Sequence, residues 1–261
     1  MNTAYTFPFG QPVINLTQQD RSPKSVFVLG VYASAVHARW VGPDGKTTIV
    51  GALAVASEPY IFWRGENAPS YIPTIDPEVG KLVPAPSNLN GPSGKALDDL
   101  FLTPMGVKRE QAWLCDIVPH SCRNPSQAKA IQDKYVPLMQ EYKLPEATVP
   151  LRQKPIPPSE KRRNEILLEI QKAEPETIVL LGDEPIEWFL WCFDDEKRKR
   201  LADFGETPDT YGRKHEVSIA GRNYEVLPLV HPRQASKLGT HSEKWFDLHQ
   251  KWINQKKADR K

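Results

Sequence analysis

Two polar residues next to apolar segments carry side chains that can transfer a proton or form hydrogen bonds with a ligand. His231 follows the apolar residues 226–230, and Asp116 lies within the apolar residues 112–118. A histidine after a strand can present one ring N–H to a carbonyl oxygen while backbone groups hold its other nitrogen. A carboxylate can act as a general base or accept a hydrogen bond from an amine. Each also has a structural interpretation, because His231 can bond to its own loop and Asp116 can cap a helix or turn.

A glycine-rich segment is a third candidate. Gly91, Ser93 and Gly94 come just before or at the start of an expected helix, and Lys95 adds a positive charge. Backbone N–H groups at such a point can approach a phosphate. Leu89 stands where the first glycine of a nucleotide P-loop belongs, so the segment is not such a loop. An ordinary capped turn is the alternative interpretation.

To act on one ligand, these residues must lie together at the carboxyl-terminal edge of a sheet. Open parallel sheets bind their ligands at this edge. Short apolar runs typical of buried parallel strands occupy residues 25–30, 112–118, 177–182 and 224–230. They alternate with helical segments. We therefore predict an α/β fold, a three-layer α/β/α sandwich with a small, mostly parallel, four-stranded central sheet.

The connecting elements follow from spacing and turn residues. Helices are predicted at residues 94–102, 126–141, 160–174, 184–193 and 242–253. Ser93 and Ser126 are the expected N-caps of the first two helices. Residues 47–55 predict a peripheral strand or hairpin arm, and residues 216–219 an antiparallel partner for the last strand. The aromatic side chains of residues 188–191 are interpreted as core packing rather than as a base-stacking platform.

Composition limits the function classes. A chain of 261 residues suits a single domain over residues 1–261. The net charge of +2 is too small for a strong nucleic-acid binder, and the basic clusters at 161–163, 197–200 and 256–261 are interpreted as solvated faces or a tail. Three cysteines without a CxxC pair indicate reduced thiols and no metal site. No apolar run of membrane-spanning length and no signal sequence occur, so we expect a cytoplasmic protein without a membrane partner.

Five short segments follow one another in a characteristic order. They are Gly30-Val31-Tyr32-Ala33-Ser34, the glycine-rich residues 91–100, Leu114-Cys115-Asp116-Ile117-Val118, residues 178–182 and His231-Pro232. From about residue 25 to residue 252, their order and spacing resemble the uracil-DNA glycosylase superfamily, particularly its thermophile-type branches. In that resemblance Asp116 occupies the position of a base-reading asparagine.

The resemblance implies a base-flipping N-glycosidase that acts on a damaged or deaminated base in DNA, with no cofactor and no metal. His231 would donate a hydrogen bond to the departing base, and Asp116 would either read an exocyclic amine or orient the attacking water. Reading an amine would shift specificity away from uracil. The implied base pocket consists of Gly30, Tyr32, Ser34, Asn88 and Leu89. The implied phosphate-binding residues are Gly91, Ser93, Gly94, Lys95 and Arg233.

The sequence also departs from the family pattern. Val31 and Tyr32 stand where relatives place a water-activating Asp, Asn or Glu, and Arg233 replaces the serine after His-Pro. Two other functions therefore stay open: a catalytically inactive module that binds nucleic acid or a nucleotide, and a hydrolase of a small nucleotide. The expected partner is DNA or a nucleotide, and the expected oligomeric state is a monomer.

Overall fold

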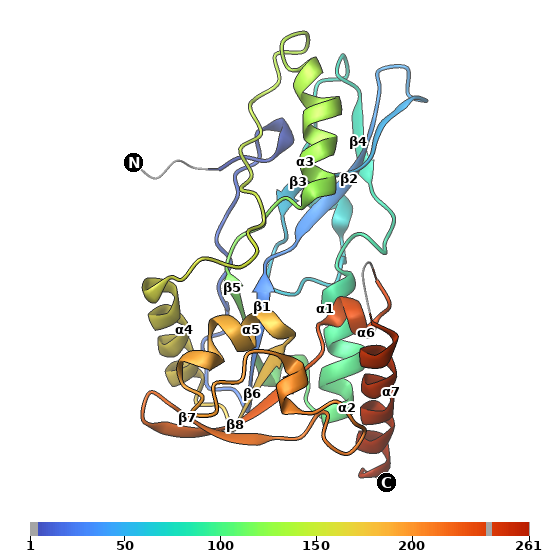
Figure 1. Ribbon diagram of the computed structural model, residues 1–261. Helices are drawn as coiled ribbons and strands as arrows, with labels where there is room; N and C mark the ends of the chain where they lie inside the picture. The colour runs from blue at the N-terminus through green and yellow to red at the C-terminus, as the bar shows by residue number, and fades with distance from the viewer. Residues whose placement is uncertain (1–4, 239–241, 261) are drawn as a thin grey trace. The chain divides into compact units, whose positions relative to one another are not determined.

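The computed structural model describes residues 5–238 and 242–260 (Figure 1). By their internal contacts these residues form two compact units. Unit 1 comprises Met1–Thr17, Tyr32–Pro92 and Val118–Gln153, and unit 2 comprises Gln18–Val31, Ser93–Ile117 and Lys154–Lys261. The single domain expected for residues 1–261 stays a prediction.

Unit 2 contains most of a five-stranded sheet with the order β5-β1-β6-β8-β7. Its strands are β1 (Val26–Tyr32), β5 (Ala112–Val118), β6 (Thr177–Leu181), β7 (His215–Ile219) and β8 (Arg222–Leu229). β1 pairs with β6 and β6 pairs with β8, in both cases in parallel. β7 pairs with β8 antiparallel through a turn in which Ala220 and Gly221 both have positive φ. The sheet is mostly parallel as expected, but it has five strands rather than four because this hairpin adds β7.

The burial of these strands explains why their sequences lack alternation. All five residues of β6 and the first six of β1 are buried. In β7, by contrast, buried Val217 and Ile219 alternate with exposed residues, as in a strand that has one face in water. The hydrogen bonds from Ser25 Oγ to Gln111 O and from Ala33 N to Val118 O indicate that β5 runs in the same direction as β1.

Helices form in the predicted regions of unit 2, but α5 ends at Trp188 rather than at residue 193, α7 continues to Ala258 rather than ending at residue 253, and α6 was not predicted. They are α1 (Pro92–Leu97), α2 (Thr103–Met105), α4 (Glu160–Ala173), α5 (Asp183–Trp188), α6 (Pro232–Ala235) and α7 (Glu243–Ala258). α1 begins at Pro92, so the prediction of Ser93 as N-cap is wrong; a proline supplies no N–H and suits the first helical position. A wide π-helical turn joins α1 to α2, and α2 packs against α7.

Unit 1 contains a separate three-stranded antiparallel sheet with the order β3-β2-β4. β3 (Thr48–Ser57) confirms the strand predicted at residues 47–55, while β2 (Ala35–Val41) and β4 (Lys81–Pro84) were not predicted. The β2–β3 turn is held by Asp44, whose Oδ1 accepts hydrogen bonds from the backbone N–H groups of Lys46 and Thr47.

The helix predicted at residues 126–141 is shorter and is capped differently. α3 (Pro125–Ala130) begins after Asn124, whose Oδ1 accepts a hydrogen bond from Gln127 N at 2.9 Å. The prediction of Ser126 as N-cap is therefore wrong. Beyond α3 the backbone widens into a π-helical turn and then tightens into a 3₁₀ turn at Val136–Leu138, where Pro137 lacks the N–H of a regular helix. None of the helices in the described residues is long and apolar enough to cross a membrane.

Candidate functional site

His231 lies at the carboxyl ends of two adjacent strands of unit 2. β6 and β8 are parallel, and beyond them Gly182 N donates a hydrogen bond to Leu229 O at 2.8 Å. Gly182 has a φ of +92°, and a Cβ at this position would lie 3.3 Å from His231 Cβ. The glycine therefore supplies both the left-handed backbone and the space that the histidine needs.

The imidazole of His231 is oriented by the backbone of its own loop. His231 is the N-cap of α6, and its Nδ1 accepts a hydrogen bond from Arg233 N at 3.2 Å. A neutral ring that accepts through Nδ1 carries its proton on Nε2. His231 therefore has the arrangement expected of a donor to a carbonyl oxygen, with one nitrogen held by backbone and the other an N–H.

A buried chain of hydrogen bonds holds the residue before His231. Val230 N donates to Tyr211 Oη at 3.1 Å, and Tyr211 Oη lies 2.8 Å from His249 Nδ1. On the other side of the ring, His249 Nε2 lies 3.0 Å from Leu100 O. Burial lowers the pKa of His249 to about 4, so the neutral ring accepts from Tyr211 and donates to Leu100. Sequence reasoning placed His249 on a helix face but missed Tyr211.

Asp116 is a buried carboxyl group in β5. It is only 3 % exposed, and its carboxyl oxygens accept no hydrogen bond from any residue that the structure describes. Burial raises the pKa of Asp116 to about 7; the charge of Glu169 adds to this rise, and the charge of Arg162 opposes it. The carboxyl group therefore changes its protonation state near neutral pH.

Arg162 of α4 fixes the backbone around Asp116. Its Nη2 donates to Asp116 O at 2.7 Å and its Nε to Ile117 O at 3.0 Å. Its Nη1 also forms ion pairs with Glu165 and Glu169. The arginine side chain is 13 % exposed, so its interpretation as part of a solvated basic face is wrong. A helical arginine gives no sequence signal for such a contact because its partners belong to a distant strand.

α4 covers the face of β5 opposite to the Asp116 side chain. Trp113 Nε1 donates to Glu169 Oε2 at 2.9 Å, and Cys115 Sγ lies 3.2 Å from Arg162 Nη2. Side chains alternate along a strand, so Asp116 points to the other face. Burial also raises the pKa of the Cys115 thiol, which agrees with an unreactive core cysteine.

Asp116 and His231 therefore both belong to unit 2, on strands that are not neighbours. β1 and β6 lie between β5 and β8 in the sheet. Three strand spacings of about 4.8 Å place the two strands about 14 Å apart. A small ligand that contacts both side chains must therefore lie over the ends of β1 and β6, with each side chain reaching toward it.

The first loop of the predicted pocket leads into unit 1. Gly30 and Tyr32 both lie within β1, so the strand extends farther than expected and the loop begins only at Ala33. Arg152 places its guanidinium carbon 4.5 Å from the centroid of the Tyr32 ring. Ser34 N donates to Glu58 Oε1 at 2.9 Å, and Ser34 O accepts a hydrogen bond from Ser121 Oγ.

Glu58 is a buried carboxylate that sequence reasoning missed. It is 2 % exposed and follows β3 directly. Besides Ser34 N, it accepts a hydrogen bond from Trp63 N at 3.3 Å. Both of its oxygens thus hold backbone N–H groups of unit 1. Its position immediately after an apolar strand was the only signal in the sequence.

Asn88 and Leu89 are exposed in unit 1, whereas the neighbouring Asn90 is buried. Asn90 Oδ1 accepts a hydrogen bond from His37 N at 2.8 Å, and its Nδ2 donates to His37 O at 3.0 Å. Asn90 therefore ties β2 to the segment after β4. A base-pocket role for Asn88 and Leu89 stays a prediction.

Gly91 has a packing reason for being glycine. Its φ is +70°, and a Cβ there would lie 2.1 Å from Gly65 N. In return, a Cβ on Gly65 would lie 2.2 Å from Asn90 O. The two backbones touch, so larger side chains are excluded on both sides. Within unit 2, Gly94 is buried and Lys95 is exposed near the start of α1, and phosphate binding by this segment stays a prediction.

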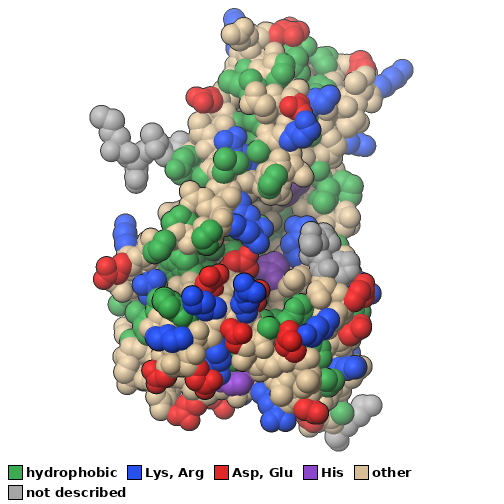
Figure 2. All heavy atoms as spheres, viewed as in Figure 1, with side chains coloured by type: hydrophobic (Ala, Val, Ile, Leu, Met, Phe, Trp, Pro, Cys, Tyr) green, Lys and Arg blue, Asp and Glu red, His purple; other side chains and the backbone are tan. Residues whose placement is uncertain are grey.

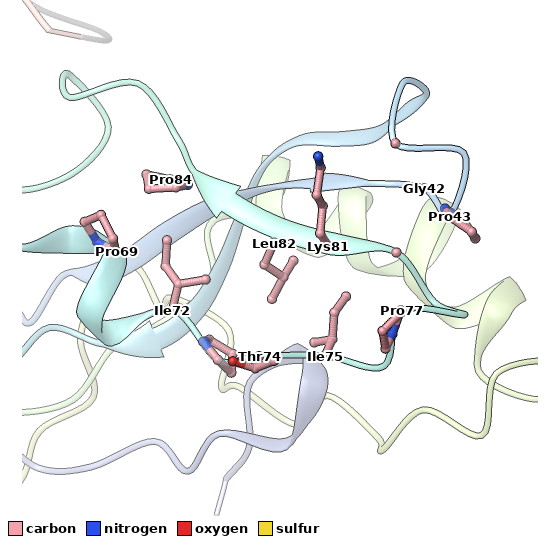
Figure 3. Close-up of a pocket in the computed structure, with 13 residues that line it drawn as sticks. Gly42, Pro43, Pro69, Ile72, Thr74, Ile75, Pro77, Lys81, Leu82 and Pro84 are labelled. Carbon is pink, nitrogen blue, oxygen red and sulfur yellow. The ribbon is translucent and has the colours of Figure 1, made fainter.

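A pocket of unit 1 lies away from all of these residues. It has a volume of about 550 Å³ and is bordered by β4 and the proline-rich segment before it (Figure 3). Ile72 and Ile75 of that segment and Leu82 of β4 line the pocket. None of the predicted site residues lines this pocket. In the described part of the chain, no group of three His, Cys, Asp or Glu side chains is arranged to hold a metal ion.

Comparison with known families identifies the class of the protein. The sequence profile of the Uracil DNA glycosylase superfamily matches residues 87–250, which is more than half of the chain, and the protein belongs to this superfamily. The match includes α1, Asp116 and His231, whereas β1–β4 precede it. A comparison with curated proteins found no match.

Proposed function

We propose that the protein is a base-flipping N-glycosidase that removes a damaged or deaminated base from DNA. Membership of the Uracil DNA glycosylase superfamily supports the reaction class. The observation that carries the proposal is the buried Asp116 carboxyl, which accepts no hydrogen bond from the described residues, at the position of the base-reading asparagine. The Asp116 oxygens are not among the fully enclosed side-chain atoms without a partner, so they keep a small contact with solvent, and a bound base would take the place of that water.

His231 would stabilise the departing base. Cleavage of an N-glycosidic bond places negative charge on the base, so a donor aimed at its carbonyl oxygen acts mainly in the transition state. The backbone bond to Nδ1 leaves the proton of the neutral His231 ring on Nε2. Such leaving-group stabilisation lowers the demand on the attacking water, which suits a chain that has Val31 and Tyr32, both within β1, where a water-activating residue was expected.

Asp116 would read the base in its protonated form. A carboxylic acid offers one O–H donor and one carbonyl acceptor, the same pair that an asparagine amide presents. The raised pKa of about 7 keeps this form populated in weakly acidic solution. Uracil remains a substrate on this proposal, and the ionised form, which only accepts hydrogen bonds, favours a base with an exocyclic amine. A role as general base predicts the opposite pH dependence.

The other predicted roles complete the proposal. Gly30, Tyr32, Ser34, Asn88 and Leu89 would line the base pocket. Gly91, Ser93, Gly94, Lys95 and Arg233 would contact phosphates. We also propose a three-layer sandwich, a monomer and a cytoplasmic location, as expected from the sequence.

A binding module without catalysis is the second candidate. Val31 and Tyr32 lie at the end of β1 and bring no carboxylate, and the two oxygens of Glu58 accept hydrogen bonds from backbone. Such a module would bind DNA or a nucleotide and form no product.

The test is base release from double- and single-stranded oligonucleotides that carry uracil, hypoxanthine or xanthine, followed by alkaline cleavage at abasic sites. We expect release by the wild-type protein and a loss of about 10²–10³-fold in rate for His231→Ala. Asp195→Asn, a change at an exposed carboxylate of unit 2, serves as control. Binding without product supports the module, and product from a free nucleoside or nucleotide alone supports a small-nucleotide hydrolase. Either result contradicts the glycosylase proposal.

A further inference from the structure

Trp191 is a large aromatic side chain at the surface of unit 2. It lies in the 3₁₀ turn Leu190–Cys192 after α5 and is 37 % exposed, unlike the buried Trp188 and Phe189. The sequence-based interpretation of this tryptophan as core packing is therefore wrong. The Nζ atoms of Lys197 and Lys199 lie 5.7 and 4.9 Å from its ring centroid. The exposed indole thus makes cation–π contacts with two ammonium groups that lie over its ring.

The loop that presents these lysines is held by buried and backbone contacts. Asp194 is 2 % exposed, and its carboxylate accepts hydrogen bonds from Arg198 Nη2 at 2.7 Å and from Arg198 Nε at 2.9 Å. Asp203 Oδ2 accepts the N–H of Lys199 at 2.8 Å. Leu201 N donates to Asp183 Oδ1 at 2.8 Å, which ties the end of the loop to the start of α5. The loop is therefore ordered before any ligand arrives.

The two lysines keep their charge available. Neither forms an ion pair with any residue that the structure describes, whereas the nearby acidic Asp194 and Glu196 both pair with Arg198. Lys197 Nζ also lies 3.4 Å from Trp191 O, and this contact does not neutralise it. Figure 2 shows Lys and Arg side chains mixed with Asp and Glu over the drawn face of unit 2, without one broad basic band. The patch consists of one indole and two lysines, a size suited to a short stretch of one strand.

We propose that Trp191, Lys197 and Lys199 bind an unpaired stretch of a DNA strand, in which one base replaces a lysine ammonium group over the indole and the two lysines pair with the adjacent phosphates. Stacking on an aromatic ring combined with cations along the backbone is how single strands bind without sequence preference. A duplex keeps its bases stacked on each other and offers no face to the ring. The choice of DNA rests on the proposed function; the stacking geometry does not.

The test is binding of a labelled, undamaged oligothymidylate to the full-length protein, followed by fluorescence anisotropy over a series of salt concentrations. Trp191→Ala should weaken binding by about fivefold or more, and Trp191→Phe should retain part of the affinity. The double change Lys197→Gln with Lys199→Gln should reduce the salt slope by about 1.4, because each lysine contributes about 0.7 on a single strand. The matched control is Lys161→Gln with Lys172→Gln, two exposed lysines of α4. Thermal unfolding of each variant checks the fold.

The outcomes separate this inference from the proposed glycosylase. Wild-type base release combined with unchanged oligothymidylate affinity in Trp191→Ala overturns the inference alone. Trp191-dependent binding without base release supports the inference and overturns the glycosylase. The inference is also overturned if polyglutamate or duplex DNA displaces the labelled oligothymidylate as well as unlabelled oligothymidylate does, because charge alone would then account for binding.

Discussion

Asp116 and His249 are two buried titratable groups of unit 2 that differ in one respect. Burial moves both pKa values, to about 7 for Asp116 and about 4 for His249, so that each group is neutral in weakly acidic solution. Both nitrogens of His249 have hydrogen-bond partners, Tyr211 and Leu100. The Asp116 carboxyl oxygens have none among the described residues. The comparison teaches that burial alone does not mark a site: the Asp116 oxygens still reach solvent and can meet a ligand, whereas both nitrogens of His249 are already occupied.

The two groups affect stability with opposite signs. Between pH 3.8 and about 7 the unfolded chain loses the Asp116 proton while the folded protein keeps it, so stability falls as the pH rises. Between pH 6.5 and about 4 the unfolded chain protonates His249 while the folded protein does not, so stability falls as the pH drops. Between about pH 4 and pH 6.5, where both groups affect stability, the fall due to Asp116 and the rise due to His249 largely cancel.

The largest effect is expected for Asp116→Asn. The wild-type protein should lose about 4 kcal/mol relative to this variant between pH 4 and pH 7.5, because the Asp116 carboxyl ionises in the unfolded chain while the folded protein keeps it protonated up to about pH 7, and asparagine does not titrate. Urea denaturation at a series of pH values measures the difference. If the difference in unfolding free energy between the wild type and the variant stayed constant across this pH range, Asp116 would not be buried in the folded protein.

A somewhat smaller effect is expected for His249→Gln. Relative to this variant, the wild-type protein should lose about 3 kcal/mol between pH 6.5 and pH 4, the reverse slope. The same denaturation series applies, and His120→Gln in unit 1 is the control histidine. If unfolding free energy, taken as wild type minus variant, changed with pH in the same direction for the Asp116 and His249 variants, the contrast between the two groups would be wrong.

The smallest effect is expected for Tyr211→Phe. The loss of the hydroxyl leaves Val230 N and His249 Nδ1 without this partner and should cost about 1.5 kcal/mol of unfolding free energy. Base release should fall as well, because Val230 precedes His231. Thermal unfolding and the release assay measure the two effects, and full stability in the variant would contradict the structural role of the hydroxyl.

The sequence predicts the strands that contain an unbroken run of buried apolar residues. β1, β5, β6 and β8 are apolar runs that end at glycine or proline or lead into His-Pro, and their positions agree with the structure. β2 was missed because it follows β1 after only two residues and carries the polar His37 and Arg39 between its buried residues. Its alternation is a strand signal that the apolar-run criterion does not detect.

Helix starts were less predictable than helix existence. Ser126 has a favourable N-cap side chain, yet Asn124 caps α3 because Pro125 occupies the first helical position. In α1 the same preference for proline displaces Ser93. In both cases the proline at the first helical position outweighed the serine.

The candidate site was predictable only in its local part. His231 follows a strand and bonds to its own loop, so neighbouring residues define its geometry. The environment of Asp116 depends on Arg162, and that of Ser34 depends on Glu58, which are contacts made by the tertiary structure. A pattern along the chain carries no information about them.

The most direct test of the account is the pH profile of uracil release by the wild-type protein and by Asp116→Asn. We predict that release by the wild type falls as the pH rises through about 7, where the carboxyl loses its proton, and that release by the variant stays flat over the same range. Identical profiles for the two proteins, or no release of any base by the wild type, would contradict the account.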